Sequence, residues 1–429
     1  MLDIKLFRDN LRLIKDSEKK RGNDLKNVEA VVKNDELWRN AIKRVEDLKR
    51  KRNVVSEKIN ALKKSGKSIS KEVKDMKKVV ADIKELDDKA AKYLEKRDSV
   101  RVLVGNILHE SVPKGKDDSE NVPVKFVGKK PTFNFKIKDH IELGENLDLF
   151  DTDSASKVAG PRFYYGKNEL VLLELALLRY AIDYMRKKGF DLISTPSMLR
   201  PNFLWGGGFL PQHADDVYYI KEEELCLLGT SEYALIAQHS DDTLKAKNLP
   251  KRYAGFSFCY RPEAGTHGRD SKGIFRLHQF SKIEQIILCK PEESWKYFEM
   301  LQEYTEEIIK NLGLHFRVVN ICTGDLSHKN AKQYDIEVWL PGQNNKKGAY
   351  REITSCSNCT NYQSVRLNIR YWKDEYKVKD YVHIVNNTAI ATPRTVIAIL
   401  ENFQQRDGSV KVPKVLWNYT GFKVIKPKK

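Results

Sequence analysis

The sequence lacks any apolar run close to the roughly 20 residues that a membrane-spanning helix needs, so a helical membrane protein is excluded. Asp3 follows the start closely and no extended apolar stretch comes after it, so we expect neither a signal peptide nor a transit peptide. Only 6 cysteines are spread over 429 residues, which favours a reduced, cytoplasmic protein over a disulfide scaffold. Internal repeats and low-complexity segments are also lacking.

Acidic residues are scarce relative to basic ones. The chain has 77 Lys and Arg against 59 Asp and Glu, a net charge of +18. This excess favours an anionic partner, nucleic acid first and a membrane surface second. The length is sufficient for two or three domains with a large core.

A heptad pattern follows the first 30 residues, which themselves suggest a short docked helix. Two apolar seams step by three and four residues, and a turn at Lys63–Ser70 separates them. Helices joined by so short a turn should fold back as an antiparallel hairpin, a coiled-coil arm over about residues 36–104. The seam positions are Trp38, Ala41, Val45, Leu48, Arg52, Val55, Ile59 and Leu62, then Met76, Val79, Ile83, Leu86, Ala90, Tyr93, Arg97, Val100 and Val104.

The far half of this arm is strongly basic. Between Lys43 and Lys78 there are 14 Lys and Arg and 5 Asp and Glu, a net of +9. A solvated helix face would carry a more balanced pattern. Contact with an RNA backbone is therefore favoured, while docking of a protein partner and solubility stay open.

The domain organisation follows from a composition change at Pro113. We expect an N-terminal domain over residues 1–112, an exposed linker rich in Pro, Gly and charge over 113–130, and a second domain over 131–429 with a short basic tail.

One stretch of the second domain predicts a strand, a loop and a returning strand. Tyr253 to Tyr260 leads in, Gly265, Gly268, Asp270 and Gly273 mark an exposed loop, and Ile274 to Ile287 returns. Alternation would place Arg261, Glu263, Arg276, Phe280 and Glu284 on one sheet face. Arginines with a ring and carboxylates suit a nucleotide, but a polar hairpin with a solvated face explains the spacing about as well.

Three further segments carry candidate ligands. Thr230 and Glu232 follow a short strand, where they either bind a small polar ligand or form an ordinary capping pair. Thr392 and Pro393 predict a helix start, and Arg394 in its first turn indicates an anion nearby.

Asn168 predicts the cap of a nearly all-apolar helix that is covered on most sides and runs through Lys188. A strand from Phe190 to Ser194 follows it. The pair Cys356 and Cys359 lacks a second ligand pair, which makes a zinc site unfavourable.

The order Arg261-x-Glu263-Ala-Gly-x-x-Gly-Arg-Asp-x-x-Gly273-Ile-Phe-Arg276-x-His-Gln-Phe280-x-Lys-x-Glu284 resembles motif 2 of the class II aminoacyl-tRNA synthetases, in the form found in the seryl-tRNA synthetase family. The helix and strand before Pro196 resemble motif 1, which forms the dimer interface of that class. The segment from Asn386 to Arg394 resembles motif 3. The resemblance implies an α+β fold: a mixed, mainly antiparallel sheet flanked by helices, with an N-terminal antiparallel helical arm.

The resemblance also implies roles for individual residues. ATP and the acyl-adenylate chemistry involve Arg261, Glu263, Arg276, Phe280 and Arg394, serine is held by Thr230, Glu232, Arg261, Glu284, Asn386 and Thr388, and Mg²⁺ is held by Glu352 and Ser355. Arg261, Glu284 and Arg394 are the expected catalytic residues.

The activity implied is ATP-dependent, AMP-forming ligation of L-serine to tRNA(Ser) by a cytoplasmic homodimer, with the basic arm gripping the tRNA. The residues that lead into motif 2, Ala254 to Arg261, and the C-terminal tail are similar to those of the eukaryotic cytosolic branch. Whether tRNA(Sec) is a substrate stays open. The alternatives are a synthetase-like ligase with another acceptor and a non-catalytic RNA-binding paralogue.

Overall fold

The computed structural model describes residues 1–263, 273–374 and 377–428, and it divides into two compact units, Met1–Ile107 and Leu108–Lys429. The loop predicted around Gly265, Gly268 and Asp270 lies outside the described residues. No helix in the described ranges is long and apolar enough to cross a membrane.

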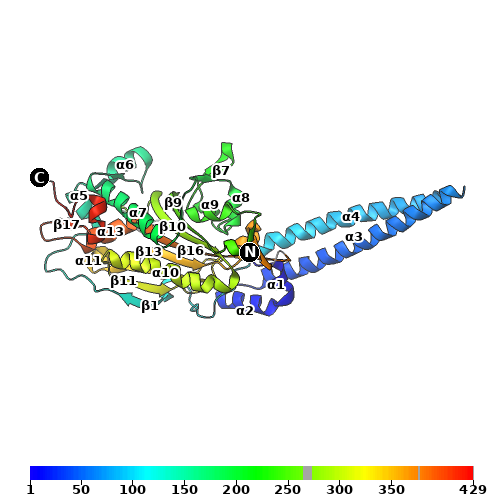
Figure 1. The fold of residues 1–429 in the computed structure, drawn as a ribbon, viewed down its shortest axis with the longest axis horizontal. Helices are drawn as coiled ribbons and strands as arrows, with labels where there is room; N and C mark the ends of the chain where they lie inside the picture. The colour runs from blue at the N-terminus through cyan, green and yellow to red at the C-terminus, as the bar shows by residue number, and fades with distance from the viewer. Residues whose placement is uncertain (264–272, 375–376, 429) are drawn as a thin grey trace. The chain divides into compact units, whose positions relative to one another are not determined.

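The first unit is helical, and its two long helices form the predicted antiparallel hairpin (Figure 1). Val45, Val79 and Ile83 are buried between them, as a heptad seam requires. Two short helices, rather than the one expected, precede the hairpin and bury Phe7 and Ile14. The helices are α1 (Ile4–Asp9), α2 (Leu11–Arg21), α3 (Lys26–Lys64) and α4 (Ser70–Arg101).

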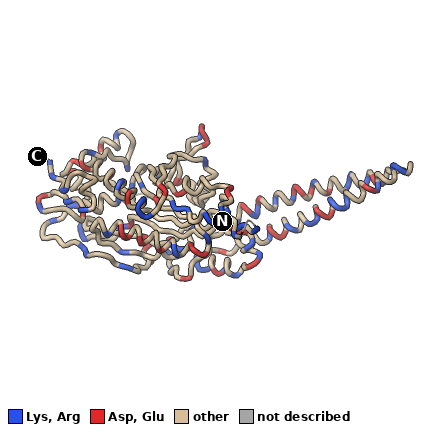
Figure 2. Tube along the Cα trace, in the orientation of Figure 1, with Lys and Arg blue, Asp and Glu red and all other residues tan. Residues whose placement is uncertain are grey.

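The second seam ends one turn earlier than the pattern predicted. Helix α4 stops at Arg101, so Val104 is buried beyond the helix instead of within it. Arg52, which occupies a seam position, is exposed, whereas Arg97 is buried. Figure 2 shows that Lys and Arg residues occur along both helices and near the turn joining them. Whether the two helices supercoil stays a prediction.

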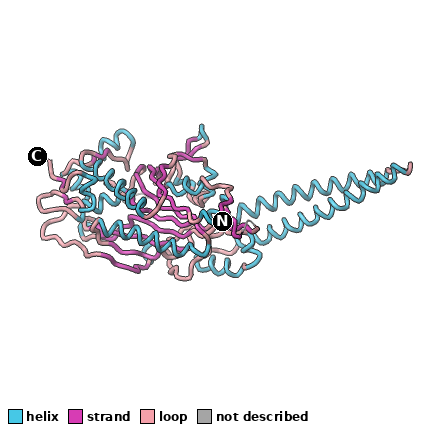
Figure 3. The backbone as a smooth tube through the Cα atoms, viewed as in Figure 1, coloured by secondary structure: helices cyan, strands magenta, loops and turns pink. Residues whose placement is uncertain are grey.

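The second unit is built on one mixed, mainly antiparallel sheet (Figure 3) with the strand order β1-β11-β12-β13-β16-β10-β9-β4. Only the β4–β9 pair among these described strands is parallel. The strands are β1 (Val122–Val127), β4 (Asp191–Ser194), β9 (Lys251–Tyr260), β10 (Gln279–Cys289), β11 (Phe316–Asn320), β12 (Lys332–Leu340), β13 (Ala349–Asn358) and β16 (His383–Ala391).

Short sheets and helices surround this layer. The helices are α5 (His140–Asn146), α6 (Thr152–Ala159), α7 (Glu169–Lys187), α8 (Pro201–Gly206), α9 (Ser231–Ala237), α10 (Ser294–Asn311), α11 (Gln343–Lys346), α12 (Tyr362–Leu367), α13 (Thr392–Asn402) and α14 (Trp417–Thr420). The small sheets contain β2 (Phe150–Asp151), β3 (Tyr165–Gly166), β5 (Met198–Leu199), β6 (Tyr219–Ile220), β7 (Leu225–Leu227), β8 (Thr243–Lys245), β14 (Arg370–Asp374), β15 (Val378–Tyr381), β17 (Val410–Lys411) and β18 (Val424–Ile425).

Part of the predicted linker is a strand. Val122–Val127 pairs with β11 at the edge of the sheet, because its alternating apolar residues favour an extended strand more than its proline opposes one. Pro123 is tolerated because it sits on an edge strand beside a register shift. The boundaries of the two predicted domains and the roles given to them stay predictions.

Helix α7 begins after Asn168 as predicted, but the Asn168 side chain does not cap it and instead donates to the Asp148 carbonyl oxygen at 2.8 Å. The helix is covered on most sides, yet one side is open, where Val171, Leu172 and Leu175 are 42–57% exposed. Exposed apolar side chains grouped in this way are typical of interaction surfaces.

The returning strand of the motif 2 stretch begins at Gln279, later than the Ile274 expected, so Arg276 lies in the turn before it. Helix α9 lies close against β9 because Gly255 has no side chain there. A Cβ at this position would lie 2.6 Å from the Leu235 side chain. This close approach places the first turn of α9 beside β10.

Candidate active site

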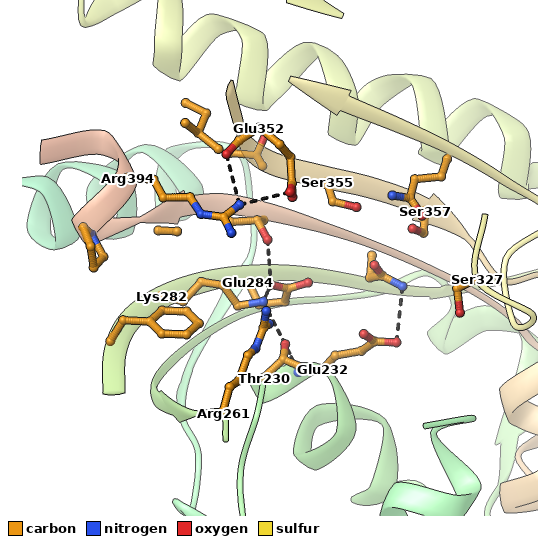
Figure 4. Close-up of a pocket in the computed structure, with 18 of the residues that line it drawn as sticks. Thr230, Glu232, Arg261, Lys282, Glu284, Ser327, Glu352, Ser355, Ser357 and Arg394 are labelled. Atoms are coloured by element: carbon orange, nitrogen blue, oxygen red, sulfur yellow. Dashed lines mark hydrogen bonds and ion pairs between the residues drawn. The ribbon is translucent and has the colours of Figure 1, made fainter. Parts of the chain in front are cut away.

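A cavity of about 300 Å³ lies where β10, β13 and β16 meet the first turns of α9 and α13 (Figure 4). Every residue expected from the sequence to bind substrate lines it, which means that widely separated segments converge on one site. These residues are Thr230, Glu232, Arg261, Glu263, Arg276, Phe280, Glu284, Glu352, Ser355, Asn386, Thr388 and Arg394. Their individual roles stay predictions.

Strand alternation sets the floor of the cavity. Phe280, Lys282 and Glu284 occupy alternate positions of β10 and all face it. The intervening side of the strand faces helix α10, where Gln285 donates to the Thr305 hydroxyl at 2.8 Å. One strand therefore serves the site on one face and the core on the other.

A bulge brings Glu352 and Ser355 to the same side of β13. Residues three apart in a regular strand point to opposite faces. Here Thr354 pairs with Ile336 and Glu352 with Glu337, so Ile353 is left without a partner in the ladder. Such an extra residue re-aims the side chains beyond it, and both Glu352 and Ser355 line the cavity.

One end of the cavity holds a buried carboxylate with its own cation. Lys282 forms an ion pair with Glu284 and donates to the Thr230 hydroxyl at 2.8 Å. Thr388 donates to Glu284 Oε2 at 3.3 Å. Burial raises the pKa of Glu284, and the ammonium of Lys282 opposes that shift. This end therefore offers a polar ligand a buried carboxylate with a lysine countercharge in contact with it.

A second carboxylate in the cavity, that of Glu232, is likewise paired with a lysine. Glu232 Oε1 accepts from Lys329 Nζ at 2.5 Å, from Gln363 at 2.6 Å and from Asn386 at 3.4 Å. Burial alone would lower the pKa of Lys329, but the Glu232 carboxylate outweighs it and raises this pKa. Thr230 also caps α9 by accepting from the Glu232 N–H at 3.3 Å. The capping and ligand interpretations of this pair are therefore compatible.

The other end of the cavity is arginine-rich. The Arg261 guanidinium lies 5.2 Å from the centre of the Phe280 ring, and its Nε donates to the Gly229 carbonyl at 3.2 Å. Arg276 forms an ion pair with Glu263 at 3.0 Å. That bond uses only Nε of Arg261, and the terminal nitrogens of an arginine can bind an anion in a bidentate geometry.

Arg394 lies in the first turn of α13, where the helix dipole favours anions. It forms an ion pair with Glu352 at 3.0 Å. The Glu352 carboxylate is therefore an anion next to Arg394, as expected for an arginine in the first turn of a helix. The predicted cap is wrong in detail: Ala391 occupies the N-cap position, and the Thr392 hydroxyl donates to the Ser281 carbonyl at 3.2 Å. That bond fixes the start of α13 against β10.

A buried acid lies behind Glu352. Asp335 on β12 is opposite Ser355 in the ladder, and burial together with the nearby charge of Glu352 raises its pKa well above the usual range. Carboxylate and hydroxyl oxygens of this kind suit a hard cation such as Mg²⁺. A cation beside Glu352 would relieve the repulsion that this pKa reflects.

Two lysines of the site, Lys282 and Lys329, were not expected from the sequence. Lys282 could have been found, because it lies between Phe280 and Glu284 on the same face of a predicted strand. Lys329 carries no such signal, since it comes from an irregular segment before β12 that only the tertiary fold brings to Glu232. The two cysteines Cys356 and Cys359 are buried free thiols, and burial raises the pKa of Cys359 to about 12.

Two family profiles match the chain. Residues 1–108 match the seryl-tRNA synthetase N-terminal domain. Residues 217–403 match the tRNA synthetase class II core domain (G, H, P, S and T). The first spans the helical unit and the second includes the whole cavity.

Full-length relatives agree with these profiles. The serine–tRNA ligase of Thermococcus sibiricus is 43% identical over 449 aligned positions, covering 100% of this chain and 98% of the relative. The crystal structure of the Pyrococcus horikoshii seryl-tRNA synthetase complexed with ATP matches with a TM-score of 0.95 at 42% identity, covering 100% of both chains.

A eukaryotic structure is also similar. The cytoplasmic serine–tRNA ligase of Naegleria fowleri, in complex with AMP, matches with a TM-score of 0.90 at 32% identity, covering 100% of this chain and 99% of that one. The two relatives above, both at 42–43% identity, are archaeal. The predicted assignment to the eukaryotic cytosolic branch is therefore not confirmed.

Proposed function

Because the chain belongs to the seryl-tRNA synthetase family of class II, we infer that it is a serine–tRNA ligase. It activates L-serine with ATP to seryl-adenylate and pyrophosphate, then transfers the seryl group to the 3′ end of tRNA(Ser). The observation that carries this function is a single cavity with paired buried carboxylates at one end and arginines at the other. A ligase with another acceptor and a non-catalytic paralogue are not favoured.

The first step needs positioning and neutralised charge, and no protein nucleophile. The serine carboxylate attacks the α-phosphate of ATP, so two anionic groups must be brought together. Arg261 lies between the two ends of the cavity and would bridge the carboxylate and the α-phosphate. Phe280 offers its ring to adenine, and Glu263 its carboxylate to the adenine amino edge, with Arg276 on the phosphates.

Serine would occupy the carboxylate end. Its ammonium would be held by Glu232 and Thr230, and its hydroxyl would bond Glu284 and Thr388, with Asn386 closing the pocket. A site with buried groups that require a hydroxyl partner rejects alanine strongly, because those groups would be left unpaired. Threonine would be excluded by size.

Mg²⁺ would be held by Glu352 and Ser355, whose oxygens and the neighbouring Asp335 fit a hard cation. When bound, the ion supplies positive charge that stabilises the phosphates. Glu352 would then exchange its ion pair with Arg394 for the cation, and Arg394 would be released to hold the γ-phosphate.

The basic helical hairpin would bind the tRNA by contacting its phosphate backbone and by fitting its shape.

A homodimer is proposed because α7 presents an apolar face and β4 adds Leu192, which is 44% exposed. A cytoplasmic location is proposed because all six cysteines are free thiols. We leave open whether tRNA(Sec) is charged.

The test is amino-acid-dependent ATP–pyrophosphate exchange without tRNA, with serine beside threonine, alanine, cysteine and glycine. We expect exchange with serine alone, followed by serylation of tRNA(Ser). Exchange with a different amino acid would contradict the pocket assignments. No exchange from a folded protein would favour the RNA-binding paralogue.

A further inference from the structure

A small three-stranded sheet of the second unit has one buried face and one open face. Its strand order is β15-β14-β8, and β14 pairs with β8 in parallel and with β15 antiparallel. Tyr371 and Leu244 are partners in the ladder and pack in a core cluster with Ile369 and Val382. Because side chains alternate along a strand, the residues on either side of Tyr371 face away from that core. The ATP and serine assignments above use none of the residues on this open face.

The open face places cations next to aromatic rings in two successive rows. In one row, Trp372 on β14 is paired with Lys245 on β8 and with Lys379 on β15. The Lys379 ammonium lies 4.5 Å from the centre of the indole ring. In the other row, Arg370 is paired with Tyr381, its guanidinium lies 4.7 Å from the ring centre, and it donates to the phenol oxygen at 2.8 Å. The face therefore combines fixed rings with positive charge.

The segments that build this face carry a large excess of positive charge. Residues 243–252 and 370–381 together contain eight Lys and Arg and three Asp and Glu, a net of +5. Lys245 and Lys379 are exposed, and so are Lys247, Lys373 and Lys377, which lie near them in the chain. A basic surface of this kind favours an anionic partner.

The aromatic rings narrow the choice among anionic partners. Lysines alone suit any surface that carries phosphates. A tryptophan on a sheet with a cation on each side suits an unpaired base and the phosphates that flank it, because the base stacks on the ring while the lysines neutralise the backbone. A base inside a duplex is already stacked and paired, so it does not use such a ring. The face therefore favours a single strand over a helical RNA.

We propose that this face binds a single strand of RNA other than the tRNA substrate. One base stacks on Trp372, and the flanking phosphates lie beside Lys245 and Lys379. A tRNA fits this face poorly, because most of its bases are paired or stacked within its own fold and its 3′ end is used in the transfer step. The inference goes beyond the proposed function, since it gives the chain a second RNA partner that is bound and not modified.

The test is binding of a fluorescently labelled RNA of about twelve uridines, within the usual length of a single-strand site, to the full chain in the presence of saturating tRNA(Ser). This probe forms no stable duplex, and bound tRNA occupies the basic hairpin. The change in anisotropy therefore reports binding outside the hairpin. We expect the probe to bind wild type and to stay bound when the tRNA concentration is raised further.

The ring is tested first. Trp372→Ala should weaken binding of the probe about 5- to 100-fold, the effect of removing the ring on which one base stacks. Trp372→Tyr, which keeps a ring on the same strand, should recover most of that loss. Phe126→Ala, which removes a ring that is 59% exposed on strand β1, should bind the probe as wild type does.

The lysines are tested by the salt dependence of binding. The double variant Lys245→Gln, Lys379→Gln should reduce the salt slope for the probe by about 0.7 for each phosphate that is no longer neutralised. The double variant Lys157→Gln, Lys411→Gln, at two exposed lysines outside this sheet, should keep the wild-type slope. Affinity for tRNA(Ser) should be the same in every variant as in wild type.

Three results would overturn the inference: displacement of the probe by tRNA(Ser), binding to Trp372→Ala that equals wild type, or the same loss in Trp372→Ala and Phe126→Ala. Serine-dependent pyrophosphate exchange within about twofold of wild type shows that each variant has folded. Lack of exchange in wild type would contradict the proposed function alone, because binding of the probe does not depend on activation of any amino acid.

Discussion

At the scale of single residues, the site is organised by two buried Lys–Glu pairs. Glu284 with Lys282 and Glu232 with Lys329 are each in contact within the cavity. A carboxylate buried without such a partner would take up a proton near neutral pH. Each lysine therefore supplies a countercharge that offsets the cost of burying its carboxylate, and these carboxylates are the groups that would recognise serine.

Replacing Lys282 should make serine activation more dependent on pH. Burial raises the pKa of Glu284 and Lys282 opposes this, so Lys282→Gln raises that pKa further. The carboxylate then forms only at higher pH, and the acidic limb of the pH profile of kcat/KM for serine moves to higher pH. At neutral pH we expect a loss of about tenfold or more, measured by pyrophosphate exchange across pH. Lys247→Gln, at an exposed lysine, should leave the profile unchanged.

Glu284 itself should determine the choice between serine and alanine. Glu284→Ala removes the acceptor proposed for the serine hydroxyl, so kcat/KM for serine should fall about 100-fold or more while that for alanine changes little. The measurement is exchange with each amino acid. Serine activation within a few-fold of wild type would show that Glu284 does not bind the hydroxyl.

At the scale of elements, irregularities matter as much as regular structure. The bulge in β13 brings Glu352 to the side of Ser355, and a short edge strand occupies what composition predicted to be a linker. In the helical unit, a polar cluster joins three helices: Asp35 on α3 accepts from Arg8 of α1 at 2.7 Å and from Arg97 of α4 at 3.0 Å.

Removing this carboxylate should loosen the base of the hairpin. Asp35→Asn takes the countercharge away from the buried Arg97, and we expect a loss of about 3–5 kcal/mol in the free energy of unfolding of the helical unit, followed by hydrogen exchange in the full chain. Asp47→Asn, which touches only an exposed 4.0 Å ion pair, should change little.

The pKa of the same carboxylate is shifted in the opposite direction to that of Glu284. Burial acts to raise the pKa of Asp35, but its bonds to Arg8 and Arg97 prevail and the pKa is lowered. Its stabilising contribution is therefore fully present above the ordinary pKa of aspartate and is lost as pH falls through the lowered value. Asp35→Asn should abolish that part of the acid sensitivity.

The basic turn of the hairpin should serve tRNA binding alone. Replacing Lys63, Lys64, Lys67, Lys71 and Lys74 by Gln should weaken tRNA(Ser) binding and reduce its salt slope by about 0.7–0.9 for each phosphate that is no longer neutralised. Seryl-adenylate formation should be spared. Equal loss of both activities would contradict this division. Replacing the tail lysines Lys414, Lys423 and Lys426 in the same way should have a smaller effect.

At the scale of the whole molecule, the exposed apolar side of α7 is the feature that a single chain does not explain. Leu172 and Leu175 are 48% and 57% exposed, and Leu192 on β4 adds to the apolar surface. Grouped apolar exposure of this extent is typical of an interface. A second copy of the chain is the occupant that the proposed function calls for.

A charge at this surface should therefore produce monomers. We expect Leu175→Glu to raise the dimer dissociation constant about 30-fold or more, the effect of disrupting a central contact, as measured by sedimentation. Val378→Glu, at a valine of β15 that is 51% exposed, should leave assembly unchanged. Wild-type protein that sediments as a monomer at micromolar concentration would contradict the prediction.

The sequence by itself determined the elements whose signals are local or periodic. The seam from Trp38 to Leu62 predicted the hairpin because coiled-coil spacing repeats within one segment. The ordered motif around Arg261 and Glu284 indicated the family and, through it, the residues expected in the site. Alternation along β10 also places Lys282 on the face of the cavity, a signal present in the sequence alone.

Only the tertiary structure decided what depends on distant partners. Lys329 reaches Glu232 from an irregular segment, and the side chain of the N-cap residue Asn168 bonds Asp148 instead of its own helix. The segment Val122–Val127, which composition assigned to a linker, becomes part of the sheet by pairing with the edge of β11. These features come from contacts between segments far apart in the chain, and local sequence patterns do not predict which distant segments will be in contact.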